Sequence, residues 1–120
     1  MRSVAGALTE RRQQYIADLE RGLELAVSRL ASLPEVEKVI VFGSYRRGRR
    51  DLFTDLDLLV LIRTPEPFLK RMERLYRLLA GIGVDLDLVA YTPEELEANR
   101  DRPFFRRALA EGEVVHEKRG

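Results

Sequence analysis

The sequence predicts an α+β domain with an α/β-like order of elements, in which a small mixed β-sheet is covered mainly by helices. Three short segments rich in branched aliphatic residues have the character of strands, and other segments have the three-and-four spacing of amphipathic helices. The 120 residues contain no repeat, no low-complexity segment and no linker. We therefore expect a single domain that spans residues 1–120.

The composition excludes several classes of protein. The formal net charge of +1 gives no overall bias toward nucleic acid. Without cysteine there is no Cys-based zinc site, and with His116 as the only histidine a Ser or Cys triad is disfavoured. No apolar run approaches the roughly 20 residues of a membrane span, and the N-terminus lacks a signal peptide. We therefore expect a cytoplasmic protein that does not enter a membrane.

Residues 9–33 are expected to form one long helix. Thr9 can cap its N-terminus, and Pro34 stops it. An apolar stripe recurs at steps of three and four: Ile16, Leu19, Leu23, Val27 and Leu30. This stripe predicts a helix that packs on a sheet, and its length leaves room for a face that binds a partner.

Two strands are expected next, with a polar loop between them. Val36–Phe42 has a high density of β-branched residues and ends at a Gly-Ser turn. Tyr45–Thr54 is rich in arginine and is expected to be a loop that could contain one helical turn. Leu56–Ile62 is almost continuously apolar, which predicts a strand buried on both faces.

The second half alternates between helix and strand. Thr64–Pro67 starts a helix whose apolar face ends near Leu79, and Gly81–Gly83 terminates it. Val84–Tyr91 is expected to be the third strand. Thr92-Pro93-Glu94-Glu95 has the sequence of a helix start with a capping box, and Asp101-Arg102-Pro103 is expected to open a further short helix that ends at about Glu111. Glu113–His116 could form a short edge strand.

Pairs of aspartates stand at the start of two of these strands. Asp55 directly precedes the second strand, and Asp57 is its second residue. Their side chains should therefore share one face, about 6–7 Å apart. Asp85 and Asp87 have the same spacing in the third strand. If these strands are neighbours, Asp55, Asp57 and one of the other two can converge. Three close carboxylates favour Mg²⁺, and two such ions about 3.5–4 Å apart suit an in-line phosphoryl or nucleotidyl displacement.

The Gly43-Ser44 turn and the arginines that follow it suit a phosphate group. Glycine lets backbone come close to phosphate, and backbone N–H groups and the serine hydroxyl can donate to its oxygens. The four arginines of Arg46–Arg50 could neutralise phosphate charge. Each feature alone is more often a plain turn or solvated surface charge. Their combination, in this order, predicts a site for a divalent metal and a triphosphate.

These residues also resemble a known family. Gly43-Ser44, ten intervening residues and Asp55-Leu56-Asp57 resemble the signature of the DNA polymerase beta-like nucleotidyltransferase superfamily, and within it the minimal nucleotidyltransferase (MNT) group. The resemblance covers most of the chain, from the first helix to the Thr92–Glu95 segment. It implies the nucleotidyltransferase fold, a site for two Mg²⁺ ions, and ATP as the substrate.

Carried over residue by residue, the resemblance implies a role for each position. Gly43 and Ser44 match the turn that holds the triphosphate, and Arg47 and Gly48 match an Arg-Gly pair common in the loop. The two metal-binding aspartates correspond to Asp55 and Asp57. The third carboxylate is matched by Asp87, because the family's strand runs from that aspartate through four apolar residues into a Thr-Pro-Glu-Glu-like turn; Asp85 is the second choice.

The sequence departs from the family's pattern at two positions, and neither departure removes a metal ligand. Thr54 stands where serine is usual, and Arg46 where a small residue is usual.

The resemblance also implies a biological role. Minimal members resemble the antitoxin half of HEPN/MNT toxin–antitoxin pairs, which implies transfer of AMP from ATP to a tyrosine hydroxyl of a HEPN partner toxin. Larger members carry further domains that hold the base and the acceptor, so we expect another protein to complete this site. One alternative is a catalytically weak binding module that neutralises a HEPN partner sterically. Another is that the arginine loop binds nucleic acid. The nucleotide, the acceptor and the oligomeric state stay open.

Overall fold

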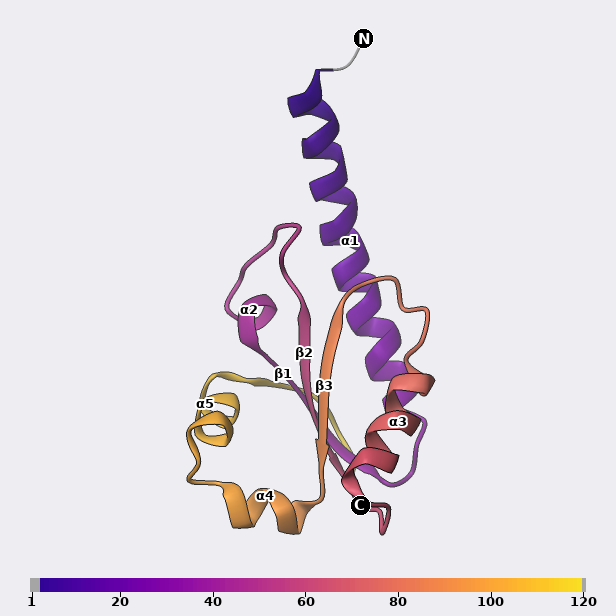
Figure 1. Cartoon of the computed structure of the whole chain (residues 1–120), viewed down its shortest axis with the longest axis vertical. Helices are drawn as coiled ribbons and strands as arrows, with labels where there is room; N and C mark the ends of the chain where they lie inside the picture. The colour runs from indigo at the N-terminus through magenta and orange to yellow at the C-terminus, as the bar shows by residue number, and fades with distance from the viewer. Residues whose placement is uncertain (1–2, 120) are drawn as a thin grey trace.

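A computed structural model describes residues 3–119, which form a four-stranded mixed sheet with helices on both faces (Figure 1). The elements are α1 (Val4–Ala31), β1 (Val36–Phe42), α2 (Gly43–Arg46), β2 (Leu56–Ile62), α3 (Phe68–Leu78), β3 (Leu86–Tyr91), α4 (Pro93–Asn99), α5 (Pro103–Glu111) and β4 (Glu113–Glu117). The predicted α+β class is confirmed, and the edge strand expected after Gly112 is present. In the described residues, no helix is both long and apolar enough to cross a membrane.

The order of strands in the sheet is β3-β2-β1-β4. Strand β1 pairs antiparallel with β2 and with β4, whereas β2 and β3 run parallel. Strand β2 is therefore central, and every residue from Leu58 to Ile62 is buried, as the apolar run predicts.

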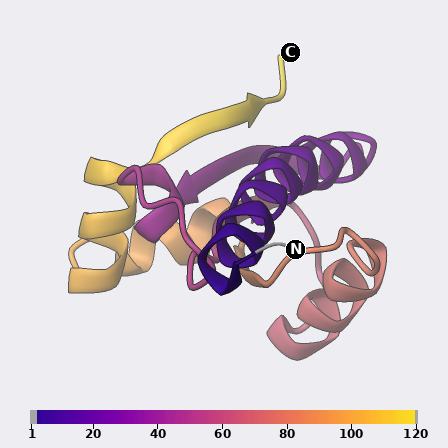
Figure 2. The ribbon, with the colours of Figure 1, turned by 90° about the horizontal axis from the view of Figure 1, so that it is seen from above.

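Two groups of helices cover the two faces of the sheet (Figure 2). On one face, α1 and α3 pack against the sheet through Ala26, Leu30, Leu75 and Leu79, which contact residues such as Leu58 and Val60. On the other face, α5 places Ala108 and Phe105 against Leu59 and Leu61, and α4 adds Leu96. Because side chains alternate along a strand, the odd-numbered residues of β2 face α4 and α5.

Helix α1 begins earlier than the sequence analysis placed it. Its N-cap is Ser3, whose hydroxyl accepts a hydrogen bond from the Gly6 N–H at 3.1 Å, whereas the Thr9 hydroxyl donates to the Ala5 carbonyl inside the helix. The helix ends at Ala31, before Pro34. Its 28 residues span about 42 Å, nearly twice the length of a seven-residue strand.

The first turns of α1 therefore extend beyond the end of the sheet (Figure 1). The molecule measures 57 × 27 × 27 Å, and its radius of gyration of 16.0 Å exceeds the roughly 14 Å of a compact domain of this length.

Two boundaries near the aspartates also differ from expectation. The helical turn expected within Tyr45–Thr54 is α2, which starts at Gly43 itself. Strand β3 starts at Leu86 rather than Val84, because Val84 packs instead on α1: a Cβ built on Gly22 would lie 2.7 Å from its Cγ2 atom. Asp85 thus precedes the strand and Asp87 lies within it.

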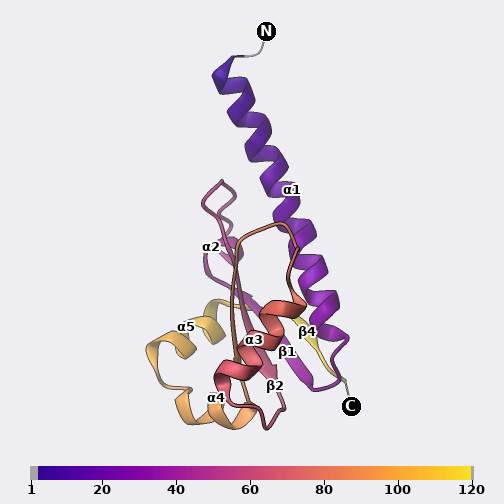
Figure 3. The same cartoon turned by 45° about the vertical axis from the view of Figure 1, so that its right-hand side comes forward.

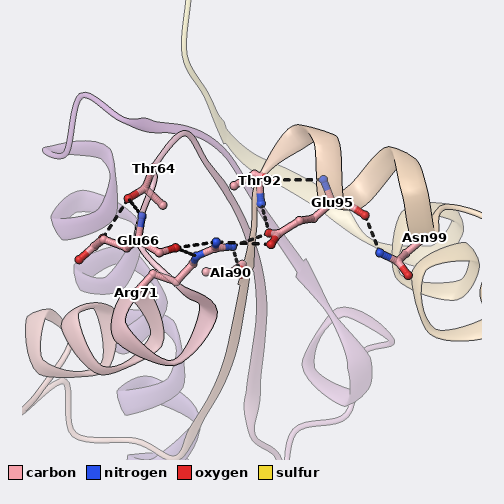
Figure 4. Close-up of polar contacts among 7 residues, drawn as sticks. All are labelled: Thr64, Glu66, Arg71, Ala90, Thr92, Glu95 and Asn99. Carbon is pink, nitrogen blue, oxygen red and sulfur yellow. Dashed lines mark hydrogen bonds and ion pairs between the residues drawn. The ribbon is translucent and has the colours of Figure 1, made fainter.

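Arg71 holds α3, β3 and α4 together at the end of the sheet away from α2 (Figure 4). Its guanidinium is almost fully buried, forms an ion pair with Glu95 and donates to the carbonyls of Glu66 and Ala90. Glu95 in turn accepts from the Thr92 N–H at 2.8 Å, which completes the predicted capping box of α4. Arg71 thereby fixes the start of α4, which leads on to α5.

Candidate active site

The register of the sheet places the predicted carboxylates side by side. Phe42 pairs with Asp57 across β1 and β2, and Asp57 pairs with Asp87 across β2 and β3. Asp55 lies beside Asp85, since the Leu56 N–H donates to the Asp85 carbonyl at 3.0 Å. The condition that the two aspartate-bearing strands be neighbours is therefore met. It is Asp87, not Asp85, that lies opposite Asp57.

Gly43 packs directly against the Asp57 side chain. Its φ of +75° favours glycine, and a Cβ at this position would lie 2.0 Å from Asp57 Oδ2. The backbone N–H of Ser44 donates a hydrogen bond to the same carboxylate. The predicted phosphate turn and the central aspartate therefore form one unit at the junction of β1, α2 and β2.

Burial and neighbouring carboxylates together disfavour the charged form of Asp57. Its pKa is raised to about 6, first by partial burial and then by the nearby charges of Asp87 and Asp55. The positive charge of Arg47 and the hydrogen bond from the Ser44 N–H oppose this shift only in part. The site thus gathers more negative charge than its own cations neutralise.

The donor set fits a hard divalent cation, because three carboxylates supply only oxygen ligands and repel one another without a cation. As they stand, however, no three or more Asp, Glu or His side chains within residues 3–119 are arranged to hold a metal ion. The metal assignment of Asp55, Asp57 and Asp87 therefore remains a prediction.

The four arginines between Arg46 and Arg50 separate into two groups. Arg50 stacks on the Tyr45 ring, 3.6 Å from its centroid, and donates to the Tyr45 carbonyl at 2.6 Å. Arg49 forms an ion pair with Asp51 at 2.8 Å. These two side chains shape the loop and are not directed to a phosphate.

The other two arginines of the cluster make longer contacts with the C-terminal elements. Arg46 and Arg47 lie 3.8 Å from Glu113 and Glu111, respectively, and both pairs are well exposed. Such pairs are weak, so either side chain can exchange its partner for a ligand. Of the two, only Arg47 contributes to the shift of the Asp57 pKa.

The sequence profile of the nucleotidyltransferase domain matches residues 20–118. The chain belongs to the nucleotidyltransferase domain family. The resemblance drawn from the Gly43-Ser44 and Asp55-Leu56-Asp57 motifs is thereby confirmed. No curated protein matches the chain significantly.

Solved structures with low sequence identity share the nucleotidyltransferase fold. A chain in a mutant of the MntA–HpeT toxin–antitoxin is 19% identical with a TM-score of 0.56, over 83% of this chain and 73% of the other. A chain in a toxin–antitoxin with AMP-PNP is 20% identical with the same TM-score, over 80% of this chain and 73% of the other. A protein from Sulfolobus solfataricus, provisionally assigned as a nucleotidyltransferase, is 22% identical with a TM-score of 0.55, over 90% of this chain and 86% of the other.

A pocket of about 160 Å³ opens beside the turn of this nucleotidyltransferase domain. It is lined by Phe42, Gly43, Arg47, Phe104, Arg107, Ala108 and Glu111. Phe42 and Phe104 form one wall, with ring centroids 5.6 Å apart and an edge-to-face arrangement. Sequence reasoning missed Arg107, because nothing in the local sequence tells which arginine of α5 faces the Gly43 turn.

Tyr15 of α1 was missed for the same reason. Its hydroxyl donates to the carbonyl of the buried Thr54 at 2.8 Å, directly before Asp55. Burial raises the pKa of Tyr15, and the charges of Asp85 and Asp55 raise it further. Tyr15 therefore ties the long helix to the segment that positions the aspartates, a contact between residues 39 positions apart.

Proposed function

We propose that this protein is a Mg²⁺-dependent nucleotidyltransferase that transfers AMP from ATP to an acceptor hydroxyl. The observation that carries the proposal is the row formed by the Gly43 turn, Asp57 and Asp87 across three adjacent strands. This row brings the Gly43 turn, which we propose binds phosphate, directly beside neighbouring carboxylates. Family membership supports the reaction class.

Asp55, Asp57 and Asp87 would hold Mg²⁺, with Asp85 as the second choice for the third ligand. When bound, the metal neutralises charge on the phosphates and on the transition state. The Asp87 side chain is solvent-exposed, so it can change rotamer at low cost. Closing the three carboxylates around a cation would also relieve the repulsion that raises the pKa of Asp57.

The turn at Gly43 would receive the β- and γ-phosphates of ATP. Backbone N–H groups near Gly43, the Ser44 hydroxyl and the Arg47 guanidinium are the donors. Arg107 adds a second guanidinium at the neighbouring pocket. These groups hold the pyrophosphate in place as it leaves.

In the reaction, the acceptor oxygen attacks the α-phosphorus of ATP and forms a new P–O bond. The bond between the α-phosphorus and the bridging oxygen breaks, and pyrophosphate leaves with the electron pair. The hydroxyl proton passes to a carboxylate oxygen of Asp87. Most of the rate acceleration comes from positioning and charge neutralisation, as in phosphate chemistry generally.

The acceptor in this proposal is a tyrosine of a HEPN-type partner toxin, and the protein acts as its antitoxin. Among proteins of the same fold, one solved structure is a toxin–antitoxin and another is a toxin–antitoxin with AMP-PNP. The MNT-like motifs Gly43-Ser44 and Asp55-Leu56-Asp57 support the same assignment.

The test is incubation with ATP labelled on the α-phosphate, Mg²⁺ and a HEPN-type toxin as the partner protein. We expect label on the partner, and its loss with Asp57→Ala but not with Asp101→Asn on an exposed surface far from the row. Absence of transfer with the unmodified chain, or equal transfer with Asp57→Ala, would contradict the proposal.

A second candidate function is steric neutralisation of the partner without catalysis. It is favoured by exposed apolar side chains such as Val4 and Phe53, which offer a binding surface that needs no chemistry. Under this candidate, Asp55→Ala and Asp57→Ala variants still neutralise the toxin. Loss of neutralisation in both variants, with binding retained, would favour catalysis.

A further inference from the structure

The free end of α1 and the tip of the loop before β2 together form a surface with no partner in the described chain. It consists of Val4, Leu8, Arg11 and Arg12 of α1 with Leu52 and Phe53 of the loop, and is called the α1–loop surface below. In both views the loop tip lies beside α1, and the first turns of the helix extend beyond it (Figures 1 and 3). We propose that the acceptor protein docks on the α1–loop surface through an apolar patch flanked by carboxylates. The acceptor role rests on the proposed function.

The surface gathers four exposed apolar side chains from two segments of the chain. Val4 and Phe53 are each 78% exposed, Leu8 is 51% exposed and Leu52 is 44% exposed. Single exposed apolar residues are ordinary, but several together mark an interaction site. A groove of about 450 Å³ runs between the two segments and is lined by Leu8, Thr9, Arg12, Asp51, Leu52 and Phe53.

The helix face itself continues a buried stripe. Leu19, Ala26 and Leu30 are fully buried against the sheet and its neighbours. Steps of three and four carry the same face N-terminally through Tyr15 and Leu8 to Val4. The sheet does not reach this far, so the stripe loses its cover although the helix continues (Figure 1). A second protein would restore that cover.

The surface lies beside the candidate active site. Phe53 is two residues before Asp55, and the buried Thr54 between them is held by the Tyr15 hydroxyl of α1. A protein bound to this surface would therefore have its neighbouring side chains next to the carboxylate row. This position suits an acceptor, whose hydroxyl must reach the α-phosphorus.

The charges decide between an acceptor protein and a second copy of this chain. Arg11 and Arg12 project from the same side of α1 as Leu8 and make no ion pair or hydrogen bond within residues 3–119. Asp51, the acidic residue of the groove, is already engaged by Arg49. An occupant must therefore bring its own carboxylates, whereas a second copy paired through the same face would bring two more arginines.

The experiment measures binding of a HEPN-type toxin to Leu8→Glu, Phe53→Glu and Arg11→Glu/Arg12→Glu variants. Leu69→Glu is the matched control, because Leu69 on α3 is also 78% exposed but lies away from this surface. Mg²⁺–ATP binding by each variant alone and transfer of labelled AMP are measured in parallel. All substituted side chains are solvent-exposed, so the fold should be retained.

We expect at least a tenfold weaker complex for the three surface variants, unchanged binding for Leu69→Glu and unchanged Mg²⁺–ATP binding throughout. Surface variants that bind the partner as tightly as the control would overturn the proposal, even if transfer occurs. So would a dimer of the chain alone that Phe53→Glu dissociates, since a second copy would then be the occupant. Weakened binding in a chain that transfers no AMP would retain the docking surface and refute the proposed function.

Discussion

At the scale of single residues, the site depends on the contact between Gly43 and Asp57. The backbone of Gly43 comes so close to the carboxylate that only a hydrogen fits between them, and the turn then gives its next N–H to the same group. The carboxylate is held partly buried near Asp55 and Asp87. Under the proposed function, Asp57 therefore serves metal binding at a cost in stability.

The variant Asp57→Asn should be more stable than the unmodified chain when metal is absent. The folded-state pKa of Asp57 is raised to about 6 from 3.8, so folding favours its protonated form. The stability that the Asp57 carboxyl contributes is fully present below its pKa of 3.8 in the unfolded chain, and it is lost as the pH rises through about 6. Thermal unfolding should show the variant's advantage at about pH 8 and little difference at about pH 4.

Magnesium should reverse this order near neutral pH. Binding to the folded state stabilises the unmodified chain, whereas the amide introduced in the variant removes a charged ligand and most of the effect. An Asp57→Asn variant that is less stable than the unmodified chain at about pH 8 without metal would contradict the electrostatic account.

The variant Gly43→Ala should lose nucleotide binding and stability together. Its Cβ would meet Asp57 Oδ2, in addition to the strain of a positive φ. Gly48→Ala is the matched control, because its φ of +98° imposes similar strain and no atom lies within 4 Å of the added carbon. Strain alone should cost about 1–2 kcal/mol in both.

Chemical denaturation and ATP titration measure the two effects. Gly43→Ala is expected to be less stable than Gly48→Ala by at least another 1 kcal/mol or so, since Asp57 must move. Equal stability and equal ATP affinity in the two variants would show that the close contact has no functional consequence.

At the scale of elements, the site depends on how three strand ends and their connecting segments are held. Strand β2 is fixed by burial on both faces, and its first residues are fixed by Thr54, which is bonded to Asp51 and to Tyr15 of α1. At the opposite end of the sheet, Arg71 joins α3, β3 and α4. The position of α5, which carries Arg107, follows from that of α4.

The variant Arg71→Ala should be destabilised by about 3 kcal/mol, because Glu95 and the carbonyls of Glu66 and Ala90 lose a buried partner. Arg77→Ala removes an exposed i, i+4 pair with Glu73 and should change stability by less than about 0.5 kcal/mol. Urea denaturation of both variants measures the difference. Similar small losses in the two would mean that the Arg71 network is not needed to hold α4.

At the scale of the whole molecule, the sequence predicted most elements and left their assembly open. Alternation along the strands placed Asp55 and Asp57 on one face, and the capping box at Thr92 located the start of α4. Strand alternation alone could not separate Asp85 from Asp87, because both have the same parity; the family resemblance favoured Asp87, and the pairing of β2 with β3 places Asp87 opposite Asp57. The start of α1 was misplaced because Ser3 and Thr9 are both good N-cap residues.

The residues missed by sequence reasoning share one property: their roles depend on contacts far apart in the chain. Tyr15 meets Thr54, and Arg107 meets the Gly43 turn, only after the sheet has brought them together. Likewise, two arginines of the loop were expected to face phosphate but are used within the loop. The long α1 leaves the exposed α1–loop surface beside the carboxylates, and this is where we propose that the acceptor protein docks.

The most direct test of the central claim is a crystal structure with Mn²⁺ and a non-hydrolysable ATP analogue. We predict anomalous density for the metal among Asp55, Asp57 and Asp87, with the terminal phosphates on the backbone of Gly43 and Ser44. Metal bound away from Asp57, or phosphates away from the Gly43 turn, would contradict the account.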